Sequence, residues 1–185
     1  MIKRIGILTS GGDAPGMNAC IRSVVRTAYK KNIYVTGIEY GFKGLLNSKF
    51  INLSPESVTN IVHKGGTILK TNRCEEFKQK KYRKVAYNNL IKENIEGLII
   101  LGGDGSFKGA SIFSKEYKIP IIGIPSTIDN DIYGTDYSIG FNTAVQTIMD
   151  SVDKIRDTAS SHERIFFIEV MGRNSGYLSI HAGNA

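Results

Sequence analysis

Two carboxylates lie close together in a stretch whose residue types suit proton transfer and metal binding. The stretch Pro125-Ser126-Thr127-Ile128-Asp129-Asn130-Asp131 directly follows the apolar run at residues 119–124. One acid of such a pair can take a proton from an attacking hydroxyl while the other supports a metal ion. The same residues also suit an ordinary turn, because Asp and Asn side chains bond to nearby backbone. The rest of the sequence must decide between these interpretations.

The first glycine-rich loop is Gly11-Gly12-Asp13-Ala14-Pro15-Gly16, between an expected strand and an expected helix. Such a loop lets backbone N–H groups approach a phosphate at the positive end of the helix. Met17-Asn18 stand where a P-loop needs Lys and Ser or Thr, so this is not a Walker A motif. Nor is it G-x-G-x-x-G, although Glu39 would suit a ribose-binding acid. We expect phosphate contact here rather than a plain turn.

The second loop, Gly102-Gly103-Asp104-Gly105-Ser106, encloses an acid among glycines, with Gly109 one turn later. An acid that faces phosphates would repel them unless a cation lies between. Mg²⁺ commonly binds one or two carboxylates together with phosphate oxygens. The loop therefore predicts a magnesium site that includes Asp104. The alternative is that Asp104 is the N-cap of the following helix.

Several arginines stand near strand ends or glycines, namely Arg73, Arg164 and Arg173. Phosphoryl transfer depends on fixed cations more than on covalent chemistry. Each arginine alone suits a surface position, but the set beside two acid–glycine loops favours function. Arg22 and Arg26 lie four residues apart, on one face of a helix. They form either a solvated face or a second phosphate site.

Strand-like and helix-like segments alternate along the chain. This alternation predicts a doubly wound α/β fold with a mainly parallel sheet sandwiched by helices. Strands are expected at residues 3–10, 33–40, 50–53, 97–101, 119–124 and 164–170; helices at 17–31, 54–65, 78–93, after 106, at 140–161 and from 171; and a turn at 41–44.

Composition narrows the classes of partner. The chain has 185 residues and a net charge of +7, and its basic residues are not interleaved with aromatics as a nucleic-acid surface requires. We expect small anionic ligands, no nucleic acid and no membrane span. Cys20 and Cys74 lack a Cys-x-x-Cys pattern, and the N-terminus resembles a first strand, which favours the cytoplasm. The end at Ala185 suggests a piece of a longer protein.

In this order along the chain, six segments resemble the bacterial ATP-dependent 6-phosphofructokinases. The resemblance implies a phosphofructokinase fold in which residues 1–185 form the ATP-binding domain, with a second domain largely absent. The six segments are Leu8–Asn18, Gly65-Gly66-Thr67, Gly102–Ser106, Thr127–Asp131, Asp157–Arg164 and Glu169–Arg173.

The resemblance also implies transfer of a phosphoryl group from Mg-ATP to the 1-hydroxyl of fructose 6-phosphate, with a role for each matching residue. Asp129 would be the base, and Asp104 and Asp131 would hold Mg²⁺. ATP would be bound by Gly12, Arg73, Cys74, Gly103, Asp104, Gly105 and Ser106. The sugar and the transferred group would be bound by Thr127, Ile128, Asp129, Met171, Gly172 and Arg173.

The remaining implied roles depend on assembly. Arg164 would reach the 6-phosphate in a neighbouring subunit, which implies a homo-oligomer, a tetramer in the bacterial family. Arg22, Arg26 and Arg156 match effector-binding arginines, although Pro55 and Asn60 depart from the family pattern.

Two positions bear on the phosphoryl donor. Diphosphate-dependent relatives resemble this chain but have Asp at position 105 and Lys at 126, whereas this chain has Gly105 and Ser126. A carboxylate at 105 would repel an α-phosphate, so Gly105 favours ATP. The alternatives are a nucleotide-binding module without catalysis, a diphosphate-dependent enzyme, or another kinase with a Gly-Gly-Asp-Gly loop, such as an NAD or lipid kinase.

Overall fold

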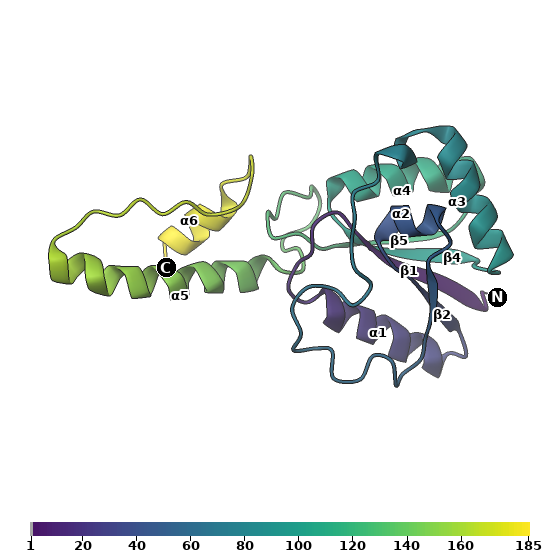
Figure 1. Ribbon diagram of the computed structural model, residues 1–185, viewed down its shortest axis with the longest axis horizontal. Coiled ribbons are helices and arrows are strands. Elements are labelled where there is room, and N and C mark those ends of the chain that lie inside the picture. Colours follow the sequence, from purple (N-terminus) through teal and green to yellow (C-terminus); the bar gives the residue numbers. More distant parts are fainter. Residues whose placement is uncertain (1) are drawn as a thin grey trace.

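A twisted five-stranded sheet with helices on both faces forms the larger part of the molecule (Figure 1). The structure is a computed structural model and describes residues 2–185. The strands are β1 (Arg4–Ser10), β2 (Tyr34–Ile38), β3 (Phe50–Leu53), β4 (Gly97–Gly102) and β5 (Ile121–Pro125). The helices are α1 (Met17–Lys30), α2 (Gly41–Leu46), α3 (Lys80–Lys92), α4 (Asp104–Tyr117), α5 (Phe141–His162) and α6 (Tyr177–Gly183), with a short 3₁₀ helix at Glu75–Lys78.

The strand order is β3-β2-β1-β4-β5, and only β3 runs antiparallel to its neighbour. Strand β1 lies at the centre, with Ile7 opposite Gly37 of β2 and Ile99 of β4. From β1 the chain proceeds outward to β2 and β3, then returns to the other side of β1 to form β4 and β5. The direction of winding therefore reverses between β1 and β4. The expected doubly wound, mainly parallel sheet is confirmed.

Each face of the sheet has its own apolar core, because successive strand residues point to opposite faces. On one face Leu8 and Ile100 are fully buried under α2, α3 and α4, together with Phe113. On the other face Ile7 and Leu101 are fully buried under α1 and the non-helical segment 54–70. Figure 1 shows α1 on one side of the strands and the other three helices on the opposite side.

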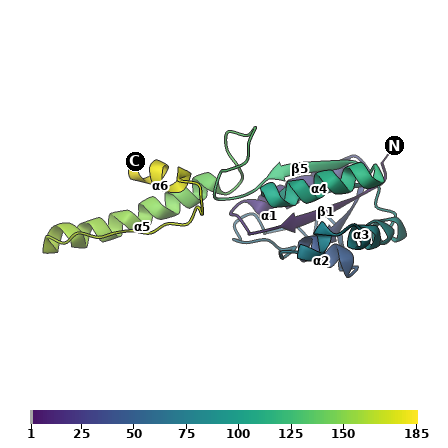
Figure 2. The same ribbon diagram turned by 90° about the horizontal axis from the view of Figure 1, so that it is seen from above.

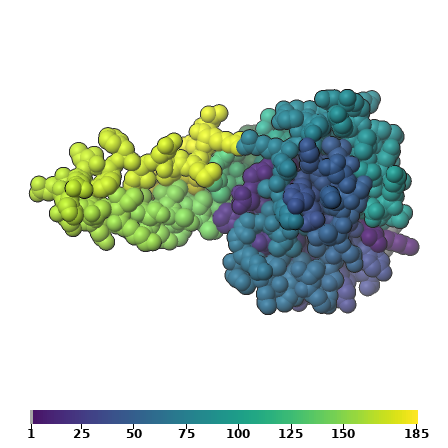
Figure 3. All heavy atoms as spheres, in the orientation of Figure 1, coloured from purple at the N-terminus to yellow at the C-terminus, as the bar shows by residue number. Residues whose placement is uncertain are grey.

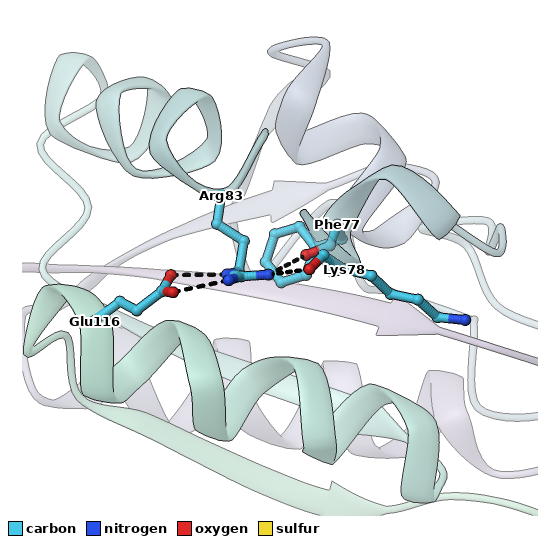
Figure 4. Close-up of polar contacts among 4 residues, drawn as sticks. All are labelled: Phe77, Lys78, Arg83 and Glu116. Atoms are coloured by element: carbon cyan, nitrogen blue, oxygen red, sulfur yellow. Dashed lines mark hydrogen bonds and ion pairs between the residues drawn. The ribbon is translucent and has the colours of Figure 1, made fainter. Parts of the chain in front are cut away.

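A mostly buried ion pair joins α3 to α4 (Figure 4). The Arg83 guanidinium is 7% exposed and donates to both carboxylate oxygens of Glu116, at 2.7 Å each. It also donates to the backbone carbonyl groups of Phe77 and Lys78. A bidentate pair whose remaining donors are also used is the favourable way to bury a guanidinium. The pair connects both helices to the 3₁₀ helix before α3.

Beyond Ser138 the chain leaves the sheet as an arm composed of α5, an irregular return segment and α6. Figures 2 and 3 show this arm projecting away from the sheet and its flanking helices. The arm begins at Gly140, which has φ 104° and would place a side-chain Cβ 2.6 Å from the Ala14 Cβ. Only glycine suits both the left-handed backbone and the close approach. The base of the arm is therefore fixed against the first glycine loop.

Two sequence predictions for the part of the molecule around the sheet differ from the structure. The helix predicted at 54–65 is wrong: the segment forms successive turns, with Asn60 at φ 56°. The hydroxyl groups of Ser54, Ser57 and Thr59 bond to nearby backbone there, which competes with helical hydrogen bonding. The turn predicted at 41–44 is instead the short helix α2.

The arm also differs from expectation. The strand predicted at 164–170 is wrong, because no neighbouring strand among residues 2–185 pairs with it and a lone strand has no ladder. Its apolar side chains are largely exposed, with Ile165 at 87% and Phe167 at 98%. The helix expected from 171 begins only at Tyr177, after a turn in which Ser175 N donates to Gly172 O.

The other predicted strands and helices are confirmed to within a few residues. Among residues 2–185, no helix is both long enough and apolar enough to cross a bilayer.

The Arg83–Glu116 pair yields a stability prediction for the full-length protein. Glu116→Gln removes the charge that compensates a buried guanidinium and should lower the unfolding free energy by about 2 kcal/mol at pH 7. Arg83 holds the pKa of Glu116 below its usual value of 4.5. A depressed pKa adds stability above the unfolded-state pKa, and this is lost as pH falls. The difference between wild type and variant should therefore narrow below about pH 4.5.

Urea unfolding followed by circular dichroism at pH 7 and pH 4 measures both effects. Glu75→Gln is the matched control, because Glu75 and its partner Lys78 are each 76% exposed. No measurable change is expected for this control. Equal losses for the two variants would contradict a special role of the buried pair.

Candidate functional site

Three loops meet at one edge of the sheet, where the carboxyl ends of β1, β4 and β5 lie side by side. They are residues 11–16 after β1, 103–106 after β4 and 126–131 after β5. The first two follow neighbouring strands at the point where the direction of winding reverses. In open α/β sheets ligands bind at this topological switch point. The sheet thus brings together all three stretches that the sequence analysis selected.

Direct contacts join the loops. Ser106 Oγ donates to Ser10 O at 3.1 Å, and Ser126 N donates to Gly102 O at 3.0 Å. A Cβ added to Gly103 would lie 4.0 Å from the Thr127 Cβ. The glycine loops are therefore packed against each other and against the acidic loop, within a few ångströms of one another.

The glycine loops lead into two helix N-termini, of which the α4 end is exposed at Asp104 and Gly105, while Met17 and Asn18 at the α1 end are buried. Gly16 is the N-cap of α1 and Gly103 is the N-cap of α4, and neither helix has a side-chain cap. A Cβ added to Gly12 or Gly105 would meet no atom within 4 Å. The first N–H groups of a helix carry partial positive charge and remain available to an anion when no side chain caps them. This edge of the sheet is suited to phosphate groups.

Asp104 is the first residue of α4, so the predicted alternative of an Asp104 N-cap is wrong. Its carboxylate is exposed and lies 2.6 Å from Lys108 Nζ, one helical turn later. Asp131 is also exposed. No group of three or more His, Cys, Asp or Glu residues could hold a metal within the described part of the chain. The two exposed carboxylates, Asp104 and Asp131, suit Mg²⁺ better than a metal that takes all its ligands from the protein. Mg²⁺ usually binds one or two carboxylates and keeps water and phosphate ligands.

Asp129 differs from both acids because its side chain is only 14% exposed. Burial raises the pKa of Asp129, and repulsion by Asp131 raises it further, while Arg173 opposes both effects. The backbone N–H of Asp129 donates a hydrogen bond to Thr127 Oγ1 at 3.2 Å. A half-buried carboxylate with a raised pKa has the character of a proton acceptor.

The arm returns to this loop from the opposite direction. Ser175 Oγ donates to Asp129 O at 2.7 Å, and Arg173 Nε lies 4.0 Å from Asp129 Oδ2. Gly172 has φ 136° and Arg173 φ 51°, which together form the turn that presents the guanidinium. Arg173 is thus adjacent to the acidic loop, and Gly172 and the exposed Met171 directly precede it in the chain. Beside them is a hollow of about 820 Å³, lined by residues 130–137 and by Asn174, Ser175, Tyr177 and His181.

The segment with Arg73 and Cys74 runs past the first glycine loop. Thr71 Oγ1 donates to Gly11 O at 2.8 Å, two residues before the exposed Arg73. Cys74 is half-buried, and burial raises the pKa of its thiol. Both residues therefore lie near the proposed phosphate site, although neither contacts the acids.

Other predicted residues are not brought into this site. Arg164 follows the 22-residue helix α5, which is about 33 Å long. Arg156 also lies on α5, which leads away from the face that carries Arg22 and Arg26 on α1 (Figure 1). Within one chain, the three predicted effector arginines therefore do not lie close together.

The sequence analysis assigned no role to two asparagines that hold these loops. Asn18 is 1% exposed; its Nδ2 donates to Lys64 O and its Oδ1 accepts from Ile68 N, which ties α1 to the segment before Thr71. Asn130 binds the backbone beyond Asp131 in a similar way. The sequence signals for these structural roles are only that Asn18 stands at a helix start and Asn130 between two acids. The backbone groups that bind the two side chains lie too far along the chain to be predicted.

Comparison with curated proteins identifies close relatives. The chain is 58% identical over 182 residues to the ATP-dependent 6-phosphofructokinase of Persephonella marina, covering 98% of this chain and 56% of the relative. It is 60% identical over 184 residues to the enzyme of that name from Caldanaerobacter subterraneus subsp. tengcongensis, covering 100% of this chain and 57% of the relative. The chain thus spans little more than half the length of these relatives.

Solved structures agree with the sequence relatives. Phosphofructokinase from Saccharomyces cerevisiae superposes with a TM-score of 0.95 at 38% identity, over 98% of this chain and 28% of that one. The pyrophosphate-dependent phosphofructokinase from Marinobacter aquaeolei superposes with a TM-score of 0.86 at 26% identity, over 99% and 49% of the two chains. The sequence profile of phosphofructokinase matches residues 4–185. The chain therefore belongs to the phosphofructokinase family.

Proposed function

We propose that the protein containing this chain transfers the γ-phosphoryl group of ATP to the 1-hydroxyl of fructose 6-phosphate, a glycolytic reaction that gives fructose 1,6-bisphosphate and ADP. The observation that carries the proposal is the position of Asp129. Its mostly buried carboxylate lies 4.0 Å from Arg173 Nε, and its loop approaches the second glycine loop, where a Cβ on Gly103 would lie 4.0 Å from the Thr127 Cβ. A base placed between a phosphate site and a fixed cation is what phosphoryl transfer to a hydroxyl requires.

ATP is assigned to the edge formed by the two glycine loops. The α1 and α4 N-termini offer uncapped N–H groups to the phosphates, and Gly12 and Gly105 leave space for them. The other nucleotide contacts are assigned to Arg73, Cys74, Gly103 and Ser106. Of these, Ser106 Oγ already donates to Ser10 O, so its hydroxyl is a support for the loop.

The choice of ATP over diphosphate has two supports. The relatives at 58% and 60% identity are named ATP-dependent, whereas the pyrophosphate-dependent structure is only 26% identical. Ser126 is 1% exposed, and its Oγ donates to Ile124 O, so it adds no charge to the site. Gly105 likewise adds no carboxylate where the donor would lie.

Mg²⁺ is assigned to Asp104, with support from Asp131, because both carboxylates are exposed at this edge. When bound, the ion would neutralise charge on the β- and γ-phosphates. Asp104 would exchange its Lys108 partner for the metal. The two acids at positions 129 and 131 then have different tasks, since only the first is desolvated.

In the transfer step, Asp129 accepts the proton of the 1-hydroxyl while the sugar oxygen bonds to the γ-phosphorus and the bond to the ADP oxygen breaks. Stabilisation of the transferring group is assigned to Arg173 and the Thr127 hydroxyl. The sugar is assigned to Ile128, Met171 and Gly172, which flank in sequence the residues that line the neighbouring hollow. Lone-pair donation by Asp129 requires its ionised form, which Arg173 favours.

The distant arginines are assigned to an assembly. The length of α5 carries Arg164 away from its own site, which supports a role at the 6-phosphate of a neighbouring subunit in a homo-oligomer, a tetramer by family resemblance. Arg22 and Arg26 would meet an effector together with Arg156 of another copy. The two cysteines are free, in keeping with a cytoplasmic enzyme.

Asp129→Ser in the full-length protein tests the catalytic base. Loss of the proton acceptor should lower kcat by about 10²–10⁴-fold, with ATP binding nearly unchanged. A coupled assay gives kcat, and calorimetry gives ATP affinity. Asp153→Ser, which alters an exposed acid on α5, is the control and should retain wild-type kcat. A kcat within a few-fold of wild type for Asp129→Ser would remove Asp129 from this role.

Gly105→Asp tests the donor site. A carboxylate here would project into the open space above the α4 N-terminus and repel the α-phosphate, so KM for ATP should rise at least about tenfold. Gly105→Ala adds bulk without charge and should have a smaller effect. If both variants keep the wild-type KM, the donor does not pass this glycine.

Assays with this 185-residue chain address the remaining alternative, a nucleotide-binding module. ATP binding without turnover by the chain, alongside turnover by the full-length protein, would assign catalysis to the whole enzyme. Turnover by the chain alone would show that no further part is needed.

A further inference from the structure

The segment between β5 and α5 forms a closed lobe with no helix or strand of its own. Its base is an isolated parallel bridge between Ser126 and Ile139, in which Ile139 N donates to Pro125 O at 2.9 Å. Its tip is open to solvent, with Tyr133 fully exposed. The two acids at positions 129 and 131 lie on the near side of this lobe. Something other than secondary structure must hold them in place.

Asn130 and Ser138 close the lobe from inside. Asn130 Oδ1 accepts from Ser138 N at 2.8 Å, and Asn130 Nδ2 donates to Asp136 O at 3.0 Å. Ser138 Oγ, on a residue that is 5% exposed, lies within hydrogen-bonding distance of both Thr127 O and Asn130 Oδ1. Its single hydrogen serves one acceptor at a time. We call these two residues with their hydrogen bonds the Asn130–Ser138 clasp.

The clasp acts on the residue between the two acids. Asn130 has φ 50°, a left-handed backbone that Asn tolerates better than most residues and that a side-chain hydrogen bond can hold. This turn places Asp129 on the inner side, at 14% exposure, and Asp131 on the solvent side. A free loop at this point would let both carboxylates face water.

We propose that the Asn130–Ser138 clasp positions Asp129 for proton transfer; the role rests on the proposed function. Asn130 and Ser138 are positioning residues, because the hydrogen bonds of their side chains go to the backbone of the lobe and to each other. Displacement of a reacting group by about 1 Å can cost on the order of 10²-fold in rate. The two glycine loops assigned to ATP follow β1 and β4, outside the lobe, so their contacts with the nucleotide do not involve the clasp.

The primary test uses the full-length protein with Ser138→Ala, which removes the bond to Thr127 O. We expect kcat to fall about tenfold while KM for ATP stays within about twofold. Ser138→Thr keeps the hydroxyl and should restore kcat. Ser151→Ala is the matched control, since it also removes a serine hydroxyl, one that donates to Thr147 O on the exposed helix α5 and lies outside the site. Its kcat should remain at the wild-type value.

A second measurement separates positioning from general support of the fold. In an Asp129→Ser background, adding Ser138→Ala should cause no further loss of kcat, because there is no carboxylate left to position. A further tenfold loss in that background would contradict the proposal. Hydrogen exchange should rise across residues 130–138 in Asn130→Ala, since the Ser138 amide loses its acceptor. Unchanged exchange would also contradict the clasp.

The outcomes distinguish the two proposals. Absence of transfer from ATP to fructose 6-phosphate by the wild type would contradict the proposed function and, with it, the role of the clasp. Normal transfer by the wild type together with wild-type kcat in Ser138→Ala would contradict the clasp alone. Reduced kcat in Ser138→Ala that Ser138→Thr restores, with no added effect in the Asp129→Ser background, would support both.

Discussion

Parallel pairing of β1 with β4 is the constraint on which the site depends. Parallel strands end at the same edge of a sheet, so the loops after them must be neighbours. Here the two loops are glycine-rich, and the strand ends from which they start are in close contact: a Cβ on Gly102 of β4 would lie 2.6 Å from Ser10 O of β1. The close approach excludes side chains and leaves backbone N–H groups as the main features of the surface. Without this pairing, the glycines of the two loops would be separate turns.

Charge balance follows from this arrangement. Phosphates that approach the two helix N-termini bring negative charge to a region that already holds three carboxylates. The acids are spread over positions 104, 129 and 131, and only Asp129 is desolvated. Exposed Asp104 and Asp131 remain available to a cation, while Arg173 compensates the buried acid. Under the proposed function, the site would draw cations from two sources, a metal ion and an arginine carried by the arm.

Asp129 and Arg173 are close in space but far apart in the sequence, because the outward helix and the return segment of the arm lie between them. Helix α5 leads outward and an irregular segment returns, so that Ser175 reaches the backbone of Asp129 across 46 positions of sequence. α6 packs beside the start of α5, with His181 edge-on to Phe141 at 5.1 Å. At the far end the apolar side chains of residues 165–168 are exposed. Large exposed apolar surface is typical of an interaction site, and the curated relatives are longer than this chain.

The sequence by itself determined the elements whose patterns are local. Apolar runs marked β4 and β5, helical spacing marked α1, acids among glycines marked two of the site loops, and two closely spaced acids marked the third. Family resemblance then named roles for individual residues. Two wrong predictions have different causes. Residues 54–65 begin like a helix, but their hydroxyl groups bond to the nearby backbone. Residues 164–170 have the composition of a strand, but no partner strand lies within the described chain.

Only the tertiary structure decided what depends on long-range contact. Asp129 and Asp131 are two residues apart and chemically identical, so the sequence offers no physical reason to treat them differently. Burial separates them, and burial depends on the left-handed turn at Asn130 and on partners eight and 46 residues away. Side-chain exposure is a property of the folded surroundings. For this reason the acids could be found from sequence, whereas the physical difference between them required the fold.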